Sequence, residues 1–135
     1  MATGQIITNS GKQIILHRTY TASPTITAPN RFKVGTGATT PTLSDTDLVT
    51  PVDIDGDNFK DFVTGYPSIN TTSLQSTIRC FLNSLEANGN TLTEFGIVNS
   101  DGTPLLFSRT VHTGISKTAS NEITYIAKDR ILWWF

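Results

Sequence analysis

The sequence predicts a mostly β protein: an antiparallel β-sandwich or flattened barrel with at most one short helix near the N-terminus. Three observations favour this class. Thr, Ser, Asn and Gly are abundant and only 16% of the 135 residues are charged, a composition typical of sheets and turns rather than helical bundles. Two dipeptides typical of tight hairpins, Asn88-Gly89 and Asp101-Gly102, separate three apolar segments. Residues 122–127 alternate apolar and polar side chains, as a half-buried strand does.

Length and charge limit the organisation and the partners. A chain of 135 residues predicts a single β domain, which we place at residues 1–127, followed by an apolar C-terminal arm at residues 128–135. Ten basic and eleven acidic side chains leave a net charge of -1, so we expect neither nucleic acid nor a membrane as partner. Cys80 is the only cysteine and no secretion signal is visible, so we expect folding in a reducing cytoplasm.

The first half of the chain predicts few regular elements. Residues 1–31 are expected to be an irregular segment, in which Asn9-Ser10-Gly11 could cap a short helix over residues 12–17. The apolar run at residues 14–16 is too short to distinguish helix from strand. Residues 31–34 predict a short strand that leads into a glycine-rich turn at residues 35–37, where we expect positive φ angles.

The second half predicts a three-stranded meander whose register follows from its two turns. If both turns have two residues, Leu82 faces Phe95 and Glu94 faces Arg109. Side chains alternate between the faces of a strand, so one face is expected to form the core. That face carries Ile78, Cys80, Leu82, Phe95, Ile97 and Leu106. The other face is expected to carry a row formed by Phe81, Gly96 and Phe107.

The C-terminal arm is a predicted interface. It ends in five large apolar residues, Ile131, Leu132, Trp133, Trp134 and Phe135. Burial of each would gain about 1.5–3 kcal/mol, so their exposure to water is costly. The polar residues Lys128-Asp129-Arg130 separate the arm from the last strand. The arm is expected either to fold back on its own sheet or to contact a neighbouring subunit. The polar residues before it favour the neighbouring subunit, and hence a homo-oligomer.

One loop carries aspartates at a spacing that could bind calcium. Asp53, Asp55, Asp57 and Asp61 occupy positions 1, 3, 5 and 9 of a loop. Carboxylates at these positions can direct oxygen atoms at one Ca²⁺. The match is incomplete, because Asn58 replaces the glycine of position 6 and Thr64 replaces the glutamate of position 12. The alternative is an acidic turn in which aspartates accept hydrogen bonds from the backbone.

No other cluster of residues predicts catalysis or a cofactor. The glycine-rich residues 35–40 lack the lysine of a phosphate-binding loop. His17 and His112 have no accompanying nucleophile or carboxylate motif. Glu94 and Arg109 could form a catalytic acid beside a cation, but such a cross-strand pair more often only favours the register. The sequence therefore predicts a non-enzymatic protein without a cofactor, calcium excepted.

Several segments carry a family resemblance. Residues 31–41 (Arg-Phe-Lys-Val-Gly-Thr-Gly-Ala-Thr-Thr-Pro) and 44–48 (Ser-Asp-Thr-Asp-Leu) resemble a signature of small virion proteins of tailed bacteriophages. Segments similar to further blocks of these proteins, and to the virion-proximal module of tail-collar fibre proteins, follow in the same order at residues 92–99, 101–109 and 115–117. Residues 7–12 (Ile-Thr-Asn-Ser-Gly-Lys) also resemble the start of these proteins. The chain departs from the pattern at Ile97 and Val98, where the family more often has Leu and Phe, and at its aromatic C-terminus.

The resemblance implies an oligomeric structural protein of the virion, assembled in the host cytoplasm, whose partners are other virion proteins and copies of itself. The first hypothesis is a tail or baseplate component that helps to mount a fibre. The second is a capsid decoration protein that binds the outside of the head and holds capsomers together. A third, which rests on the aspartate loop instead, is a carbohydrate-binding adhesin module.

Overall fold

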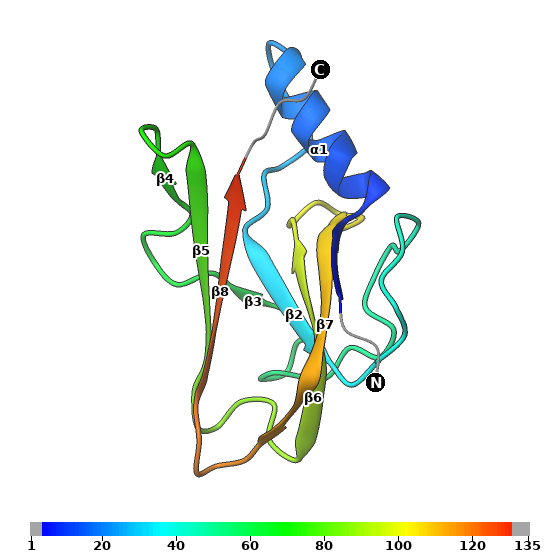
Figure 1. Cartoon of the computed structure of the whole chain (residues 1–135), viewed down its shortest axis with the longest axis vertical. Coiled ribbons are helices and arrows are strands. Elements are labelled where there is room, and N and C mark those ends of the chain that lie inside the picture. The colour runs from blue at the N-terminus through cyan, green and yellow to red at the C-terminus, as the bar shows by residue number, and fades with distance from the viewer. Residues whose placement is uncertain (1–3, 131–135) are drawn as a thin grey trace.

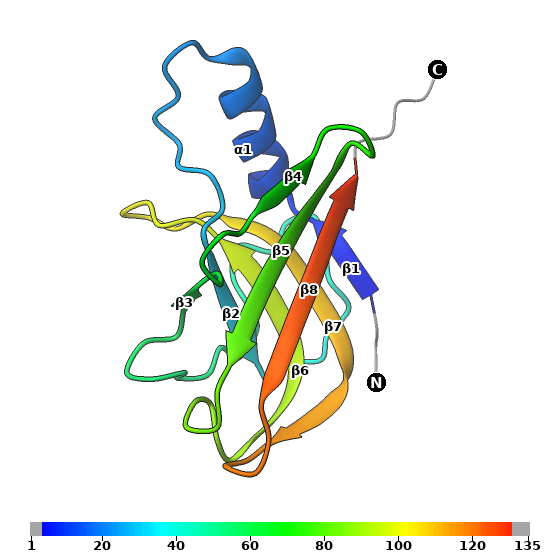
Figure 2. The same cartoon turned by 90° about the vertical axis from the view of Figure 1, so that its left-hand side faces the viewer.

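The computed structural model describes residues 4–130 and has two antiparallel sheets that pack face to face (Figures 1 and 2). A five-stranded sheet has the order β1-β7-β6-β2-β3, and a three-stranded sheet has the order β4-β5-β8. One helix, α1, lies at one end of the two layers. The predicted class, mostly β with a short N-terminal helix, is therefore confirmed. The elements are β1 (Gly4–Ile7), α1 (Asn9–Tyr20), β2 (Arg31–Gly35), β3 (Lys60–Asp61), β4 (Ser68–Asn70), β5 (Gln75–Leu82), β6 (Asn90–Val98), β7 (Leu106–Lys117) and β8 (Ile123–Arg130).

The core lies between the two sheets. Tyr125 of β8 stacks on Phe95 of β6, with ring centroids 4.4 Å apart and planes 6° from parallel, so these rings join the layers. Cys80 is fully buried, and desolvation raises the pKa of its thiol to about 12, which leaves the thiol protonated at neutral pH. The predicted core face is confirmed for five residues, Ile78, Cys80, Leu82, Phe95 and Ile97.

The N-terminal segment is more regular than the sequence predicted. Strand β1 pairs antiparallel with β7, and α1 runs for 12 residues rather than the expected six. Thr8 caps the helix: its hydroxyl accepts a hydrogen bond from the Gly11 amide at 3.0 Å and donates one to the Leu106 carbonyl. The prediction of an irregular segment is wrong over β1, because pairing with a strand about 100 residues away leaves no local signal. The expected short helix is confirmed, although it is longer than predicted.

The predicted hairpin between β5 and β6 is wrong. Strand β5 pairs with β4 and β8, and residues 83–89 carry the chain across to the other sheet. The Ala87 amide donates to the Ile54 carbonyl at 3.1 Å, and Ala87 itself has a φ of 55°. Leu82 and Phe95 are nevertheless both core residues, because β5 and β6 face each other across the core.

The β6–β7 hairpin exists, but its register is shifted. Residues 99–105 form its loop, in which Asn99 and Asp101 bond each other and Thr27 instead of making a two-residue turn. Arg109 therefore lies opposite Gly96, and Glu94 lies opposite Val111. A shift of two residues keeps Glu94 and Arg109 on one face, so the predicted pair still forms diagonally.

A bulge within this hairpin changes which residues reach the core. The register slips between Ile97 and Val98, so that Phe107 packs in the core while Leu106 lies beside Gly96 on the outer face. The predicted row of Phe81, Gly96 and Phe107 does not exist. Leu106 is buried as predicted, but not on the predicted face.

Strand β8 continues through Lys128-Asp129-Arg130, which pair with β5. The expected boundary after residue 127 therefore falls inside a strand, because backbone pairing is indifferent to these polar side chains. The predicted interface residues 131–135 lie outside the described residues. Within residues 4–130, no helix combines the length and the apolar character needed to cross a membrane.

Candidate functional site

Residues 36–51, here called the cover loop, lie over the outer face of the five-stranded sheet. Figure 1 shows this cyan-to-teal segment on the side of the sheet that faces away from β5 and β8. Its two ends are joined by a hydrogen bond from the Thr36 amide to the Thr50 carbonyl at 3.0 Å. Leu48 is buried under the loop against Gly96. The loop thus gives the sheet a second protected face, in addition to the core.

Glu94 of β6 holds the cover loop from beneath. Its Oε1 accepts hydrogen bonds from the amides of Gly37 at 3.0 Å and Thr50 at 2.8 Å, and its Oε2 accepts one from Val49 at 3.0 Å. These amides come from both arms of the loop, so one carboxylate binds the two arms together. Each bond joins a charged acceptor to a backbone donor, which makes it stronger than a neutral hydrogen bond.

Arg109 of β7 completes this network. Its Nε donates to Oε2 of Glu94 at 2.9 Å, and its Nη1 donates to Oδ2 of Asp45 at 3.0 Å. Its Nη2 donates to the Thr39 hydroxyl at 3.4 Å. The side chains of Glu94 and Arg109 are both 0% exposed. The sequence therefore predicted the partners correctly, but this is an enclosed ion pair rather than a simple register pair.

Asp45 is the second carboxylate of the network and comes from the cover loop itself. Burial alone would raise its pKa, but hydrogen bonds from the amide and hydroxyl of Thr42 and the nearby Arg109 guanidinium outweigh that effect. The pKa of Asp45 is therefore lowered from its usual value, and the carboxylate stays ionised. Arg109 thus lies between two negative charges, one from the sheet and one from the loop.

Glycines leave the space that this network occupies. A Cβ atom on Gly35 or Gly37 would lie 2.5 or 2.6 Å from Oε1 of Glu94, and one on Gly96 would lie 2.8 Å from Leu48. Neither Gly35 nor Gly37 has a positive φ, so that expectation is wrong. These glycines are needed because their backbone approaches Glu94 closely, not because the turn requires a left-handed conformation.

The network fits a structural task. Both oxygens of Glu94 already accept two hydrogen bonds each, and the carboxylate is closed off from solvent. An acid or base in catalysis needs access to the proton that it transfers. What this arrangement can do is fix a long loop rigidly on a sheet.

The aspartate loop has the geometry of a turn. Oδ1 of Asp53 accepts a hydrogen bond from the Gly56 amide at 2.8 Å, and Oδ1 of Asp61 pairs with Arg31 at 3.3 Å. Asp55 and Asp57 are exposed. Within residues 4–130, no three acidic, histidine or cysteine side chains come together closely enough to hold a metal ion. The calcium site stays a prediction, which calorimetric titration with millimolar calcium tests.

The two histidines lie apart from this network. Nε2 of His112 lies 3.0 Å from the hydroxyl of Tyr125, so this pair bridges β7 and β8. Burial, and to a lesser degree Cys80, raises the pKa of Tyr125, which keeps the phenol protonated. His17 is on α1, and its Nδ1 is buried without a hydrogen-bond partner among the described residues. The structure brings neither histidine to the aspartates or to Glu94.

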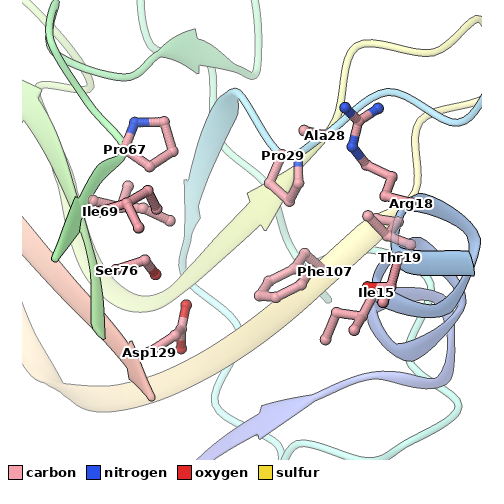
Figure 3. A pocket seen from close by; sticks show the side chains of 12 residues that line it. Ile15, Arg18, Thr19, Ala28, Pro29, Pro67, Ile69, Ser76, Phe107 and Asp129 are labelled. Carbon is pink, nitrogen blue, oxygen red and sulfur yellow. The ribbon is translucent and has the colours of Figure 1, made fainter. Parts of the chain in front are cut away.

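A cavity of about 270 Å³ opens between α1 and the three-stranded sheet. Figure 3 shows Ile15 and Arg18 of α1 on one side of it and Ile69 and Asp129 on the other, with Phe107 between them. The lining is mainly apolar, yet Asp129 points its carboxyl group into it. Burial raises the pKa of Asp129.

Replacement of Asp129 by asparagine is expected to raise the melting temperature at pH 7. The raised pKa means that ionised Asp129 disfavours the folded state, and this cost develops as the pH rises from the unfolded-state value near 3.8 through the higher folded-state value. Asparagine removes the charge at every pH. Thermal unfolding of both proteins between pH 3 and pH 7 measures the difference, which should vanish at the acidic end. A gain that is equal at both ends would contradict this explanation.

Sequence reasoning missed three polar residues that the structure places in fixed roles: Thr8 and Lys117, which are fully buried, and Asp45, which is partly buried. Asp45 binds Arg109, Thr8 caps α1, and Lys117 donates from Nζ to the Asn88 side chain at 2.6 Å and to the Thr118 carbonyl at 3.0 Å. All three lie inside the segments that carry the virion-protein resemblance or at their ends. That overlap was the one signal available, since nothing in their immediate neighbourhood in the sequence indicates these contacts.

Comparison with known proteins adds no relative. No family model, no curated protein and no solved structure matches this chain.

Proposed function

We propose that this chain is a non-enzymatic structural protein of a tailed-bacteriophage particle. Within that class, the proposal is a tail or baseplate component that helps to mount a fibre. Its partners are then other virion proteins and further copies of the same chain. The proposal starts from the resemblance of residues 7–12, 31–48 and 92–117 to virion proteins.

The observation that carries the proposal is that the residues of this resemblance converge in space. Gly35, Gly37 and Asp45 come from the first block, and Glu94 and Arg109 come from the later ones. Their contacts form one network beneath the cover loop, although contacting residues are up to 64 positions apart in the sequence. Because the residues of the resemblance fix the cover loop on the five-stranded sheet, they support the interpretation of the chain as a rigid structural protein.

The Thr8–Lys12 region supports the same interpretation. Thr8 caps α1 and binds β7, and a Cβ atom on Gly11 would lie 2.1 Å from the Phe107 carbonyl oxygen. The block at residues 7–12 therefore also contributes to close packing between elements.

Labelling of intact particles tests the proposal. A gold-labelled antibody raised against the chain is expected to bind the tail or baseplate in electron micrographs. Particles without the gene should then have sound heads and lack fibres. Label on the head, with fragile heads after gene loss, would instead support the capsid decoration protein. Absence of the chain from purified particles would refute both.

A further inference from the structure

Strand β8 leaves one edge of its sheet unpaired. All eight of its residues pair with β5 on one side, and the order β4-β5-β8 places no strand on the other side within residues 4–130. Figure 2 shows β5 and β8 side by side in the front layer, with β8 at its margin. An unpaired edge exposes backbone donors and acceptors that can pair with another chain.

The other edges of the two sheets are short, whereas β8 is long. Edge strand β1 has four residues, β4 has three and β3 has two. Strand β8 has eight residues, contains no proline and pairs with β5 without a bulge. Strand β8 lacks three usual means of protecting an edge, namely shortness, proline and bulges, and its charged residues Lys128, Asp129 and Arg130 all lie in its C-terminal half.

The outer face of β8 has an apolar centre. Thr124, Ile126, Lys128 and Arg130 are exposed along this face. Ile126 is 60% exposed, although it lies in the middle of a regular strand. A neighbouring chain that covers Ile126 would remove its apolar surface from water, which lowers the free energy.

The charges of β8 fit an antiparallel copy of the same strand. Pairing about Ile126 places Ile126 opposite itself and Thr124 opposite Lys128 of the other copy. Extended by one residue beyond the start of β8, the same register places Glu122 opposite Arg130 of the other copy. Glu122 is exposed, and within the described residues Arg130 has no carboxylate partner. Parallel pairing would instead set Lys128 and Arg130 beside their own copies, which is unfavourable.

We propose that two copies of the chain associate by antiparallel pairing of their β8 strands, centred on Ile126. The three-stranded sheets of the two copies then form one continuous sheet across a two-fold axis. Each residue contact occurs twice, so two Glu122–Arg130 pairs flank the central isoleucines. This inference concerns the chain alone and does not depend on the proposed place in a virion.

Cross-linking at the two-fold axis tests the geometry. Residues directly opposite in an antiparallel pair have Cα atoms about 4.5–5.5 Å apart, which a disulfide can span. The Ile126→Cys variant is therefore expected to form a covalent dimer under mild oxidation. The matched control is Ile69→Cys on the opposite edge of the same sheet, where the native isoleucine is 67% exposed. The native Cys80 is fully buried and does not compete.

A charge swap tests the register independently. The Arg130→Glu variant places like charges opposite each other and should weaken the dimer roughly tenfold or more in analytical ultracentrifugation. Adding Glu122→Arg to that variant restores opposite charges and should restore the dimer. The Arg130→Gln variant is the control, because it also removes the hydrogen bond from Nε of Arg130 to the Ser73 carbonyl at 3.2 Å but adds no negative charge.

Three results would overturn the inference. The first is a cross-linking yield of Ile126→Cys no higher than that of Ile69→Cys. The second is a double charge variant that dimerises no better than Arg130→Glu alone. The third is a chain ending at Arg130 that no longer cross-links through Ile126→Cys, because the C-terminal residues would then hold the copies together. All three leave the virion assignment standing, which particle labelling decides.

Discussion

Replacement of Glu94 by alanine is expected to lower the free energy of unfolding by about 3–5 kcal/mol. The variant removes four hydrogen-bond acceptor contacts at once, three of them with the amides of Gly37, Val49 and Thr50. It also leaves Arg109, which is fully buried, with one carboxylate instead of two. For a domain of this size, the loss corresponds to a fall in melting temperature of roughly 10–15 °C.

Urea unfolding at neutral pH measures this loss, and the Asp61→Ala variant is the matched control. Asp61 pairs with Arg31 at 3.3 Å, but its side chain is 78% exposed. An exposed pair contributes at most about 1 kcal/mol, so the control should unfold almost like the parent protein. Equal losses in the two variants would show that water enters beneath the cover loop and that the network is not enclosed.

Replacement of Gly11 by alanine is expected to destabilise the fold by about 2–3 kcal/mol, although it improves helix propensity. Alanine is favoured over glycine by about 1 kcal/mol inside a helix, so local reasoning predicts the opposite sign. The added Cβ would lie 2.1 Å from the Phe107 carbonyl oxygen and 2.9 Å from Cγ2 of Ile7. That carbonyl also accepts the Thr8 amide at 3.1 Å, so α1 cannot move away without loosening its own start.

The Gly102→Ala variant provides the comparison for Gly11. Among residues 4–130, no atom lies within 4 Å of a Cβ placed on Gly102, and the φ of Gly102 is not positive. Its stability should therefore stay within about 0.5 kcal/mol of the parent. Thermal unfolding of both variants shows whether helix propensity or the close contact with the Phe107 carbonyl dominates the effect of Gly11→Ala. A melting temperature that rises in Gly11→Ala would mean that helix propensity outweighs the contact with β7.

The sequence could predict which side chains face the core because alternation along a strand is a local property. Ile78, Cys80 and Leu82 are assigned correctly even though their strand was given the wrong neighbour. The neighbour could not be predicted, because Asn88-Gly89 lies in a connection between sheets and not in a hairpin. Turn residues report a local backbone preference, and that preference is compatible with both arrangements.

The candidate site could be predicted only in part for a similar reason. Glu94 and Arg109 were paired correctly, since an even shift in register leaves both on one face. Their burial could not be predicted, because the cover loop that encloses them precedes Glu94 by more than 40 residues. Asp45 belongs to that loop, and its contact with Arg109 has no counterpart in local sequence pattern.

The cover loop is held by its backbone on the side that faces the sheet, so its outward side chains are not needed for its attachment. Every hydrogen bond from the cover loop to Glu94 is made by a backbone amide, so these bonds do not depend on the side chains of Val49 and Thr50. The exposed side chains of Thr40 and Leu43 take no part in it. These outward positions are free to diversify, or to carry a grafted peptide, while the scaffold beneath them stays unchanged.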